Sequence, residues 1–322
     1  MNMKKFGNSN ETISLLGLGC WGIGKAQWIG ADDNESIKVL QKAIEQGINF
    51  FDTALVYGNG HSERLVGAVE RESGKKLFIA SKIPSMKNEW PAAKNSTLKE
   101  SYPKSHIIKK TEESLRNLKR DYIDLMQFHV WNDKWAGNDE WKEAIEKLKS
   151  DGKVRFWGIS MNDHQPTNGI ETGKTGLIDS FQVIFNIFEQ HPVERLFPFC
   201  KENEISIIAR VPFDEGALTG NIDPSTQFPV GDFRNEYFKD KRKIDVKLRV
   251  DKIWNDVKTE TSCMAEAALR FIISHDAVTS VIPGVRKEKN LKANIASIKK
   301  GKLSPKLLDE LKVHKWDKNF YE

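Results

Sequence analysis

The sequence predicts a (β/α)8 barrel, a closed ring of eight parallel strands in which a helix follows each strand. Three observations lead to this fold class. Eight short apolar runs alternate with amphipathic stretches, the runs are almost continuously apolar, and no linker of low complexity divides the 322 residues. Such runs are typical of a parallel sheet that helices cover, and eight strand–helix units in this length match a barrel. We therefore expect one barrel domain over residues 1–322, with a short N-terminal hairpin and an extra C-terminal helix.

Four of the units occupy residues 13–150. The expected strands are the runs ISLLGLG (13–19), INFFDT (48–53), KLFIASK (76–82) and YIDLMQFH (122–129). Helices are expected over 34–46, from about residue 62, over 105–120 and over about 139–150. The first helix has the periodicity of an amphipathic helix, since one face carries Ile37, Leu40, Ala43 and Ile44.

The other four units follow over residues 154–299. Their strands are VRFWGIS (154–160), SFQVIFN (180–186), ISIIARV (205–211) and AVTSVIPG (277–284). Helices are expected near 165–173, over 192–202, once or twice within 241–274, and over 288–299. The run SPKLLDELKVHKW (304–316) is the extra helix, and the segments 84–103 and 221–243 are long loops on the face formed by the strand ends.

Composition and charge exclude several classes of protein. The 50 basic and 45 acidic residues are interspersed, unlike the clustered basic face of a nucleic-acid-binding protein. The three cysteines, Cys20, Cys200 and Cys263, give neither a disulfide framework nor the spacing of a metal site. No apolar run reaches the roughly 18 residues of a membrane span, and the N-terminus lacks a signal-peptide core. We expect a cytoplasmic protein without a nucleic-acid or membrane partner, and the oligomeric state stays open.

Chemically useful side chains gather where three consecutive strands end. The second strand ends at Asp52, with Tyr57 five residues later, the third ends at Lys82 and the fourth at His129. In a barrel the loops after the strands build the active site, so these four side chains are expected to meet. Each residue alone also fits a structural role.

Together the four groups suit the protonation of an oxygen that gains negative charge. A tyrosine hydroxyl is a weak proton donor near neutral pH, and a neighbouring lysine ammonium is expected to lower its pKa. A carboxylate beside the lysine keeps the ammonium charged, and a histidine donates a hydrogen bond to a substrate oxygen. Hydride addition to a carbonyl creates such an oxygen, so the set predicts carbonyl reduction.

The stretch LGLGCWGIG (16–24) has two possible interpretations. Gly17, Gly19 and Gly22 give the G-x-G-x-x-G spacing of a Rossmann turn, which requires a helix that opens inside the motif. Here the first helix signal comes only near Asp33, and Trp21 stands where such a turn needs a small residue. We interpret the stretch as the first strand-to-helix loop of a barrel, with a Rossmann dehydrogenase as the weaker alternative.

These segments resemble the aldo-keto reductase family over nearly the whole chain. DTALVYGNGHSERLVG (52–67) resembles the family signature D-T-A-x-x-Y-G-x-G-x-S-E-x-x-x-G, and FIASK and YIDLMQFH resemble its lysine and histidine strands. The resemblance implies a (β/α)8 barrel that reduces a small aldehyde or ketone with NADPH. It matches the four residues at the strand ends to the catalytic tetrad, Asp52, Tyr57, Lys82 and His129.

The resemblance also implies which residues bind the cofactor. LGLGCWGIG, GIS, FQVIFN, PFDEGALTG and VIPGVRKEKNLKAN resemble the family's cofactor contacts. The implied residues are Gly19, Cys20, Trp21, Asp52, Ser160, Asn162, Gln182, Arg210, Val211, Pro212, Phe213, Gly216, Leu218, Pro283, Gly284, Val285, Arg286, Asn290 and Asn294. Arg286, with Lys287 beside it, is placed to hold a 2′-phosphate, which predicts a preference for NADPH over NADH.

The sequence departs from the family pattern at three positions. Many members have G-x-S-N where this chain has Ser160-Met161-Asn162, so either a bulge brings Asn162 to the nicotinamide carboxamide or Asp163 or His164 intrudes. Arg210 stands where an aromatic residue commonly stacks under the nicotinamide, and it places a positive charge beside that ring. Ala293 stands where the family often has a glutamate before the asparagine.

The long loops, together with several tryptophans along the chain, predict an aromatic substrate pocket. The residues expected to line it are Trp21, Tyr57, Trp90, His129 and Trp131, with Trp28 and Trp135 as further candidates. Such a pocket admits apolar or sugar-like carbonyl compounds, and packing of the same tryptophans beneath the loops is the alternative. A second function also stays open, because the family includes cofactor-sensing regulatory subunits of channels. The intact tetrad favours an enzyme.

Overall fold

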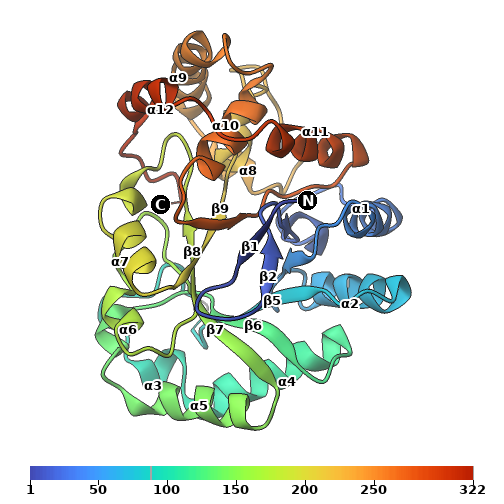
Figure 1. Ribbon diagram of the computed structural model, residues 1–322, viewed down its shortest axis with the longest axis vertical. Coiled ribbons are helices and arrows are strands. Elements are labelled where there is room, and N and C mark those ends of the chain that lie inside the picture. The colour runs from blue at the N-terminus through green and yellow to red at the C-terminus, as the bar shows by residue number, and fades with distance from the viewer. Residues whose placement is uncertain (88, 322) are drawn as a thin grey trace.

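A ring of parallel strands forms the centre of the computed structural model, which describes residues 1–87 and 89–321 (Figure 1). The strands neighbour one another in chain order: β3 (Leu18–Gly19), β4 (Phe50–Asp52), β5 (Phe78–Ile83), β6 (Ile123–Phe128), β7 (Val154–Ser160), β8 (Ser180–Ile184), β9 (Ser206–Arg210) and β10 (Val278–Val281). Parallel bridges from Leu16 to Val281 and from Gly19 to Gly284 join the first strand to the last. The predicted (β/α)8 barrel is therefore confirmed.

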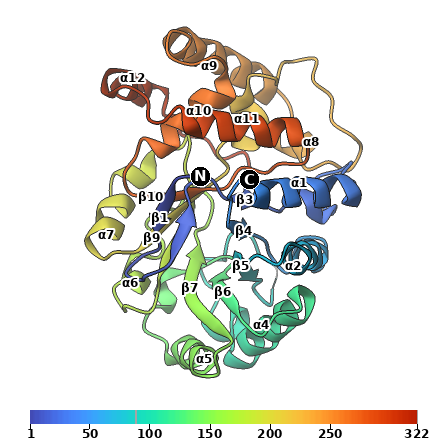
Figure 2. The same ribbon diagram turned by 45° about the vertical axis from the view of Figure 1, so that its right-hand side comes forward.

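Helices cover the outside of the ring, as Figures 1 and 2 show. Those that follow the barrel strands are α1 (Asp33–Glu45), α2 (His61–Ser73), α4 (Lys104–Leu118), α5 (Asp139–Ser150), α6 (Ile170–Gly173), α7 (Leu196–Glu202), α10 (Met264–Ile273) and α11 (Glu288–Lys299). The additional helices are α3 (Leu98–Ser101), α8 (Arg234–Tyr237), α9 (Arg242–Val257) and α12 (Pro305–Glu310). Of the described residues, none belongs to a helix long and apolar enough to cross a bilayer.

The first helix shows how the sequence forms these elements. Asp32 caps its N-terminus by accepting a hydrogen bond from the backbone N–H of Glu35 at 2.9 Å. Its inner face buries Leu40, Ala43 and Ile44, as the periodicity predicts.

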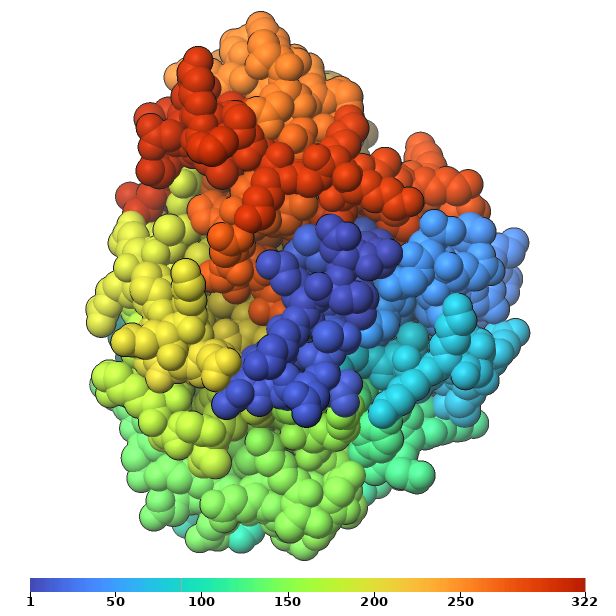
Figure 3. All heavy atoms as spheres, viewed as in Figure 1, coloured from blue at the N-terminus to red at the C-terminus, as the bar shows by residue number. Residues whose placement is uncertain are grey.

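An N-terminal hairpin closes one end of the barrel. Its strands, β1 (Met3–Lys5) and β2 (Thr12–Ser14), pair antiparallel. Phe6 and Ile13 pack against Phe50, Phe78 and Leu125 in one buried cluster. Figure 3 shows the N-terminal segment in dark blue across the middle of this face. The end that remains for a functional cleft is the opposite one, where the strands finish.

Several predicted elements have different bounds in the structure, among them the extra C-terminal helix, which ends at Glu310 and continues as a 3₁₀ turn (Leu311–His314). The expected strand 13–19 is divided, because residues 13–14 belong to the hairpin and only Leu18–Gly19 joins β4. The helix expected over 192–202 begins at residue 196, after a 3₁₀ turn (His191–Val193) that contains Pro192. The helix expected near 165–173 is reduced to its last turn, Ile170–Gly173.

Candidate active site

A cleft of about 1150 Å³ opens at the carboxyl ends of the barrel strands. Residues at or just beyond the strand ends line it, among them Asp52, Ser160 and Arg210, and so does Gln182 on β8. Active sites of (β/α)8 barrels lie at this end. The volume exceeds the roughly 300–1,000 Å³ of a pocket for one small ligand, so the cleft has room for a pair of ligands.

Three of the predicted catalytic side chains meet at the inner end of this cleft. The strand register aligns Asp52 on β4 with Ala80 on β5, so Lys82 follows two residues further along the neighbouring strand. The Lys82 Nζ donates to Asp52 Oδ1 at 2.6 Å, to the Thr53 carbonyl at 2.9 Å and to the Tyr57 hydroxyl at 3.3 Å. The lysine is 1% exposed, so its ammonium is held entirely by these partners.

Two amides hold the other oxygen of the aspartate. Gln182 Nε2 donates to Asp52 Oδ2 at 2.7 Å, and Gln127 Nε2 donates to the same oxygen at 3.3 Å. These bonds fix the carboxylate while leaving Oδ1 for Lys82.

Burial dominates the protonation of these groups. It raises the pKa of Tyr57 above its ordinary value and outweighs the Lys82 ammonium, which acts to lower it. The expected lowering of the tyrosine pKa by the lysine is present, but burial outweighs it. For Lys82, burial favours the neutral amine, yet Asp52 and Tyr57 hold the lysine pKa above its ordinary value. The site thus keeps a protonated tyrosine beside a charged ammonium.

His129, the fourth predicted residue, faces the tyrosine across the cleft. Its ring centroid lies 5.9 Å from that of Tyr57 and 4.9 Å from that of Trp90, edge to face in both cases. Burial, then the charges of Lys82 and Arg210, lower the pKa of His129 well below its ordinary value. The neutral imidazole has one N–H to donate to a ligand.

A buried ion pair stands beside the tetrad. Asp163 accepts a bond from Arg210 Nη2 at 2.5 Å and another from Trp90 Nε1 at 2.5 Å. Arg210 also donates to the Met161 carbonyl at 3.0 Å, but its buried Nε has no partner in the described part of the chain. An unpaired buried donor is costly, and a ligand that accepts from it removes this cost.

The far end of the cleft is basic. Arg286 Nη1 donates to the Ile29 carbonyl at 2.8 Å. The guanidinium of Arg234 lies 4.4 Å from the centroid of the Trp28 ring and donates two hydrogen bonds to the Asp232 carboxylate. Burial, then the charge of Arg234, lower the pKa of Arg286 from its ordinary value. An anion bound here would relieve the repulsion between the two guanidinium groups.

Comparison with known proteins identifies the family. The model of the Aldo/keto reductase family matches residues 15–315. The chain belongs to the aldo/keto reductase family.

Relatives and solved structures agree with this assignment. The chain is 32% identical to the uncharacterized oxidoreductase YqkF of Bacillus subtilis (strain 168), over 98% of this chain and 96% of that protein. It is 30% identical to the aldo-keto reductase YhdN of the same organism, over 91% and 87% of the two chains. The structure of the glycerol dehydrogenase from Gluconobacter oxydans superposes with a TM-score of 0.80 at 26% identity, over 97% and 94% of the two chains.

Most of the cofactor-binding residues expected for an aldo/keto reductase line the cleft. They are Gly19, Trp21, Asp52, Ser160, Gln182, Arg210, Val211, Pro212, Phe213, Gly216, Gly284, Arg286, Asn290 and Asn294. Five do not line it: Cys20, Asn162, Leu218, Pro283 and Val285. The Cys20, Leu218 and Val285 side chains are packed in the core, and the Pro283 carbonyl accepts the backbone N–H of Gly19 at 3.0 Å.

Of the two alternatives expected for residues 160–164, the structure has the second: Asp163 lines the cleft and Asn162 does not. The Asn162 Nδ2 donates to the Trp131 carbonyl at 2.8 Å, and its Oδ1 accepts the Trp131 N–H at 3.1 Å. With its amide occupied by backbone, Asn162 is turned from the cleft, and the neighbouring Asp163 lines the cleft instead.

The expectation that Trp131 lines the substrate pocket is wrong. Its side chain is 0% exposed, its ring packs against Phe128 at 4.6 Å, and its Nε1 donates to Thr172 Oγ1 at 2.8 Å. Trp135 is likewise buried and bonded to the Ser96 carbonyl. The other expected pocket residues, Trp21, Tyr57, Trp90 and His129, do line the cleft, as does Trp28.

The glycine-rich first loop serves barrel packing. A Cβ at Gly17 would lie 2.6 Å from Phe50 Cδ1, and one at Gly19 would lie 2.8 Å from the Ile282 carbonyl. The helix that a Rossmann turn needs begins only at Asp33. The motif therefore reflects the closure of this aldo/keto reductase barrel.

Several residues that line the cleft were not among the site residues expected from the sequence. They are Glu215 after β9, Phe233 and Arg234 in the long loop 221–243, and Tyr321 near the end of the chain. The loop 221–243 was expected on this face, so its aromatic and basic residues could have been predicted to line the cleft. Nothing in the local sequence links Tyr321 to a cleft formed by the barrel strands.

Proposed function

We propose that this protein reduces an aldehyde or ketone to the alcohol with NADPH, and that Tyr57 is the general acid. The observation that carries the proposal is the buried Lys82 ammonium, which is bonded to Asp52 and to the Tyr57 hydroxyl, two residues that line the cleft. The reduced nicotinamide, when bound, supplies a hydride to the carbonyl carbon.

The residues of the chain manage the proton. Tyr57 gives its hydroxyl proton to the carbonyl oxygen as negative charge develops there, and the Lys82 ammonium stabilises the phenolate that remains. A proton from solvent then restores the tyrosine. The neutral His129 donates a hydrogen bond to the same oxygen and orients the carbonyl. A positioned general acid of this kind contributes about 10²- to 10⁴-fold to the rate.

The residues present fit a nicotinamide dinucleotide. One end of the cleft holds the tetrad and the unpaired Arg210 Nε, and the other end holds the two mutually repelling guanidinium groups of Arg286 and Arg234. We assign Arg210 to the nicotinamide end and Arg286, with Lys287, to the 2′-phosphate of NADPH. Cationic groups at this position favour NADPH over NADH.

The carboxamide contact requires residues other than Asn162. Ser160 at the end of β7 and Gln182 on the adjacent strand β8 line the cleft, and the register aligns the two residues. We assign the carboxamide to this pair. The substrate then lies between the nicotinamide and the rings of Trp21 and Trp90.

A two-stage experiment tests the proposal. Each reduced cofactor is first titrated into the purified protein, and NADPH oxidation is then followed by absorbance with a panel of aldehydes, ketones and sugars. Turnover of a carbonyl compound supports the proposal. Tight NADPH binding without oxidation of any compound favours the regulatory alternative, and failure to bind either cofactor contradicts both.

A further inference from the structure

The turn that follows β9 has an unusual backbone and carries an acidic residue into the cleft. Asp214, Glu215 and Gly216 have φ angles of 49°, 56° and 111°, and Val211 also has a positive φ of 54°. Positive φ is uncommon for non-glycine residues and a genuine outlier for valine, so surrounding contacts must hold this turn in place. Glu215 is 7% exposed and lines the cleft together with Gly216.

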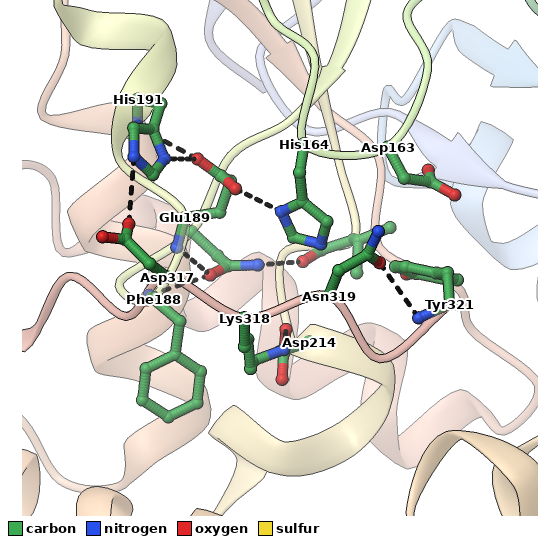
Figure 4. Close-up of polar contacts among 12 residues, drawn as sticks. Asp163, His164, Phe188, Glu189, His191, Asp214, Asp317, Lys318, Asn319 and Tyr321 are labelled. Carbon is green, nitrogen blue, oxygen red and sulfur yellow. Dashed lines mark hydrogen bonds and ion pairs between the residues drawn. The ribbon is translucent and has the colours of Figure 1, made fainter. Parts of the chain in front are cut away.

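The segment after α12 supplies contacts that hold the turn. Lys318 Nζ binds Asp214 Oδ1 at 2.9 Å and the Tyr237 hydroxyl at 2.9 Å. The Tyr321 hydroxyl donates to Glu215 Oε1 at 2.6 Å. The same segment is fixed further back by Asp317, whose Oδ1 lies 3.0 Å from His191 Nε2. Figure 4 shows Asp317 next to His191 and Lys318 next to Asp214.

The two neighbouring carboxylates of the turn differ in their partners. Asp214 forms an ion pair with Lys318. Glu215 has no ion pair among the described residues, and Tyr321 is the donor to its carboxyl group. Arg210, the cation that acts on Glu215 from the end of β9, is already paired with Asp163.

Burial makes the charged form of Glu215 unfavourable. Burial first, then the charge of Asp214, raise the pKa of Glu215 to about 7, although the Tyr321 hydrogen bond and Arg210 act to lower it. Asp163 raises it further, and the charge of Glu215 in turn raises the pKa of Tyr237 on α8. The side chain therefore changes charge near neutral pH, inside the wall of the cleft.

We propose that Glu215 couples cofactor binding to a proton: the neutral acid admits the anionic dinucleotide, and the carboxylate repels it. This inference rests on the proposed function, because it requires that a nicotinamide dinucleotide occupies this cleft. A dinucleotide that extends from the tetrad to Arg286 brings its phosphates into the cleft that Glu215 lines. Bound phosphates then keep the glutamate protonated, and the neutral acid offers an O–H donor in place of a repelling charge.

Linkage fixes the direction of the effect. If the neutral form binds, the complex takes up one proton whenever the free protein has Glu215 ionised. The apparent Kd is then flat below about pH 7 and rises about tenfold per pH unit well above it.

The test is a titration of NADH at a series of pH values from about 6 to about 9, followed by quenching of tryptophan fluorescence. NADH is the probe because the 2′-phosphate of NADPH itself titrates near pH 6. We expect the wild-type Kd to rise about tenfold between about pH 8 and about pH 9. Glu215→Gln should give a flat profile, because its amide oxygen still accepts from Tyr321 but carries no charge. Glu236→Gln, which removes an exposed carboxylate outside the cleft wall, is the matched control and should keep the wild-type slope.

A second variant covers the case in which Glu215→Gln does not fold. Tyr321→Phe removes the hydrogen bond that favours the carboxylate, so the pH at which affinity begins to fall should move upward. A wild-type Kd that does not change with pH, a slope retained in Glu215→Gln, or no shift in Tyr321→Phe overturns the proposal. Absence of binding at every pH contradicts the proposed function itself.

Discussion

Replacing either member of the Asp52–Lys82 pair tests whether this ion pair contributes to the stability of the fold as well as to catalysis. Both side chains are almost fully buried, with exposures of 3% and 1%, and their charged atoms lie 2.6 Å apart. Removing one partner of a buried pair leaves an uncompensated charge and costs about 3–5 kcal/mol, whereas removing both charges is often nearly neutral. A folded domain has roughly 5–15 kcal/mol of stability, so the single variants should still fold.

The expected result is a coupling between the two changes. Asp52→Asn and Lys82→Met should each lower the free energy of unfolding by about 3–5 kcal/mol, and the double variant should be less destabilised than either single one. Urea unfolding followed by tryptophan fluorescence gives these energies by linear extrapolation. All three variants should lack reductase activity, so the variants are compared by their free energies of unfolding and not by their turnover.

An exposed pair provides the control. Lys247 and Asp251 form an ion pair on α9 with side chains 40% and 54% exposed. Lys247→Met should change the free energy of unfolding by less than about 1 kcal/mol, as exposed pairs do. If the Asp52 and Lys82 variants lose no more than this control, or if their losses add in the double variant, the two buried charges do not depend on each other for stability.

Three further predictions concern binding and chemistry. Tyr57→Phe should lower kcat by about 10²- to 10⁴-fold while NADPH binding, measured by fluorescence, survives, and retention of most activity would remove Tyr57 from its role. Arg210→Tyr should leave a working enzyme but strengthen the binding of oxidised relative to reduced cofactor, because a cation beside the nicotinamide is lost; an unchanged ratio of the two dissociation constants would place Arg210 elsewhere. Arg286→Ala should weaken NADPH binding by about 10- to 150-fold, the loss of one charge-assisted contact, with little effect on NADH. Equal NADPH affinity in the variant and the wild type, or tighter NADH binding in the wild type, would show that Arg286 does not select the phosphate.

The sequence predicts those parts of the site that depend on strand order alone. Asp52, Lys82 and His129 each stand at or next to the end of an apolar run, and parallel strands bring such residues to one end of the ring. The register of β4 and β5 then suffices to place the Lys82 ammonium between Asp52 and Tyr57.

Contacts between loops could not be predicted from strand order or periodicity. Trp90 reaches Asp163 across 73 residues and Tyr321 reaches Glu215 across 106, and no periodicity encodes either meeting. Trp131 was expected in the pocket as one of several tryptophans on the active-site face, yet its ring is fully buried in the core. The net direction of the Tyr57 pKa shift could not be predicted for a related reason, because burial depends on the whole assembled wall and not on the neighbouring lysine alone.

The seam of the barrel, where its first and last strands meet, has a consequence for the order of folding events. It joins residues that are far apart along the chain, such as Ser280, whose hydroxyl reaches the Leu15 carbonyl 265 positions away. Contacts of such long range are formed slowly, because a large loop must be ordered before they give any stability. The tetrad, by contrast, comes from residues 52–129, whereas Gly19 and Gly284 in the wall of the cleft come together at the seam. A partly folded chain can therefore assemble its proton-transfer groups before it has a cleft in which to use them.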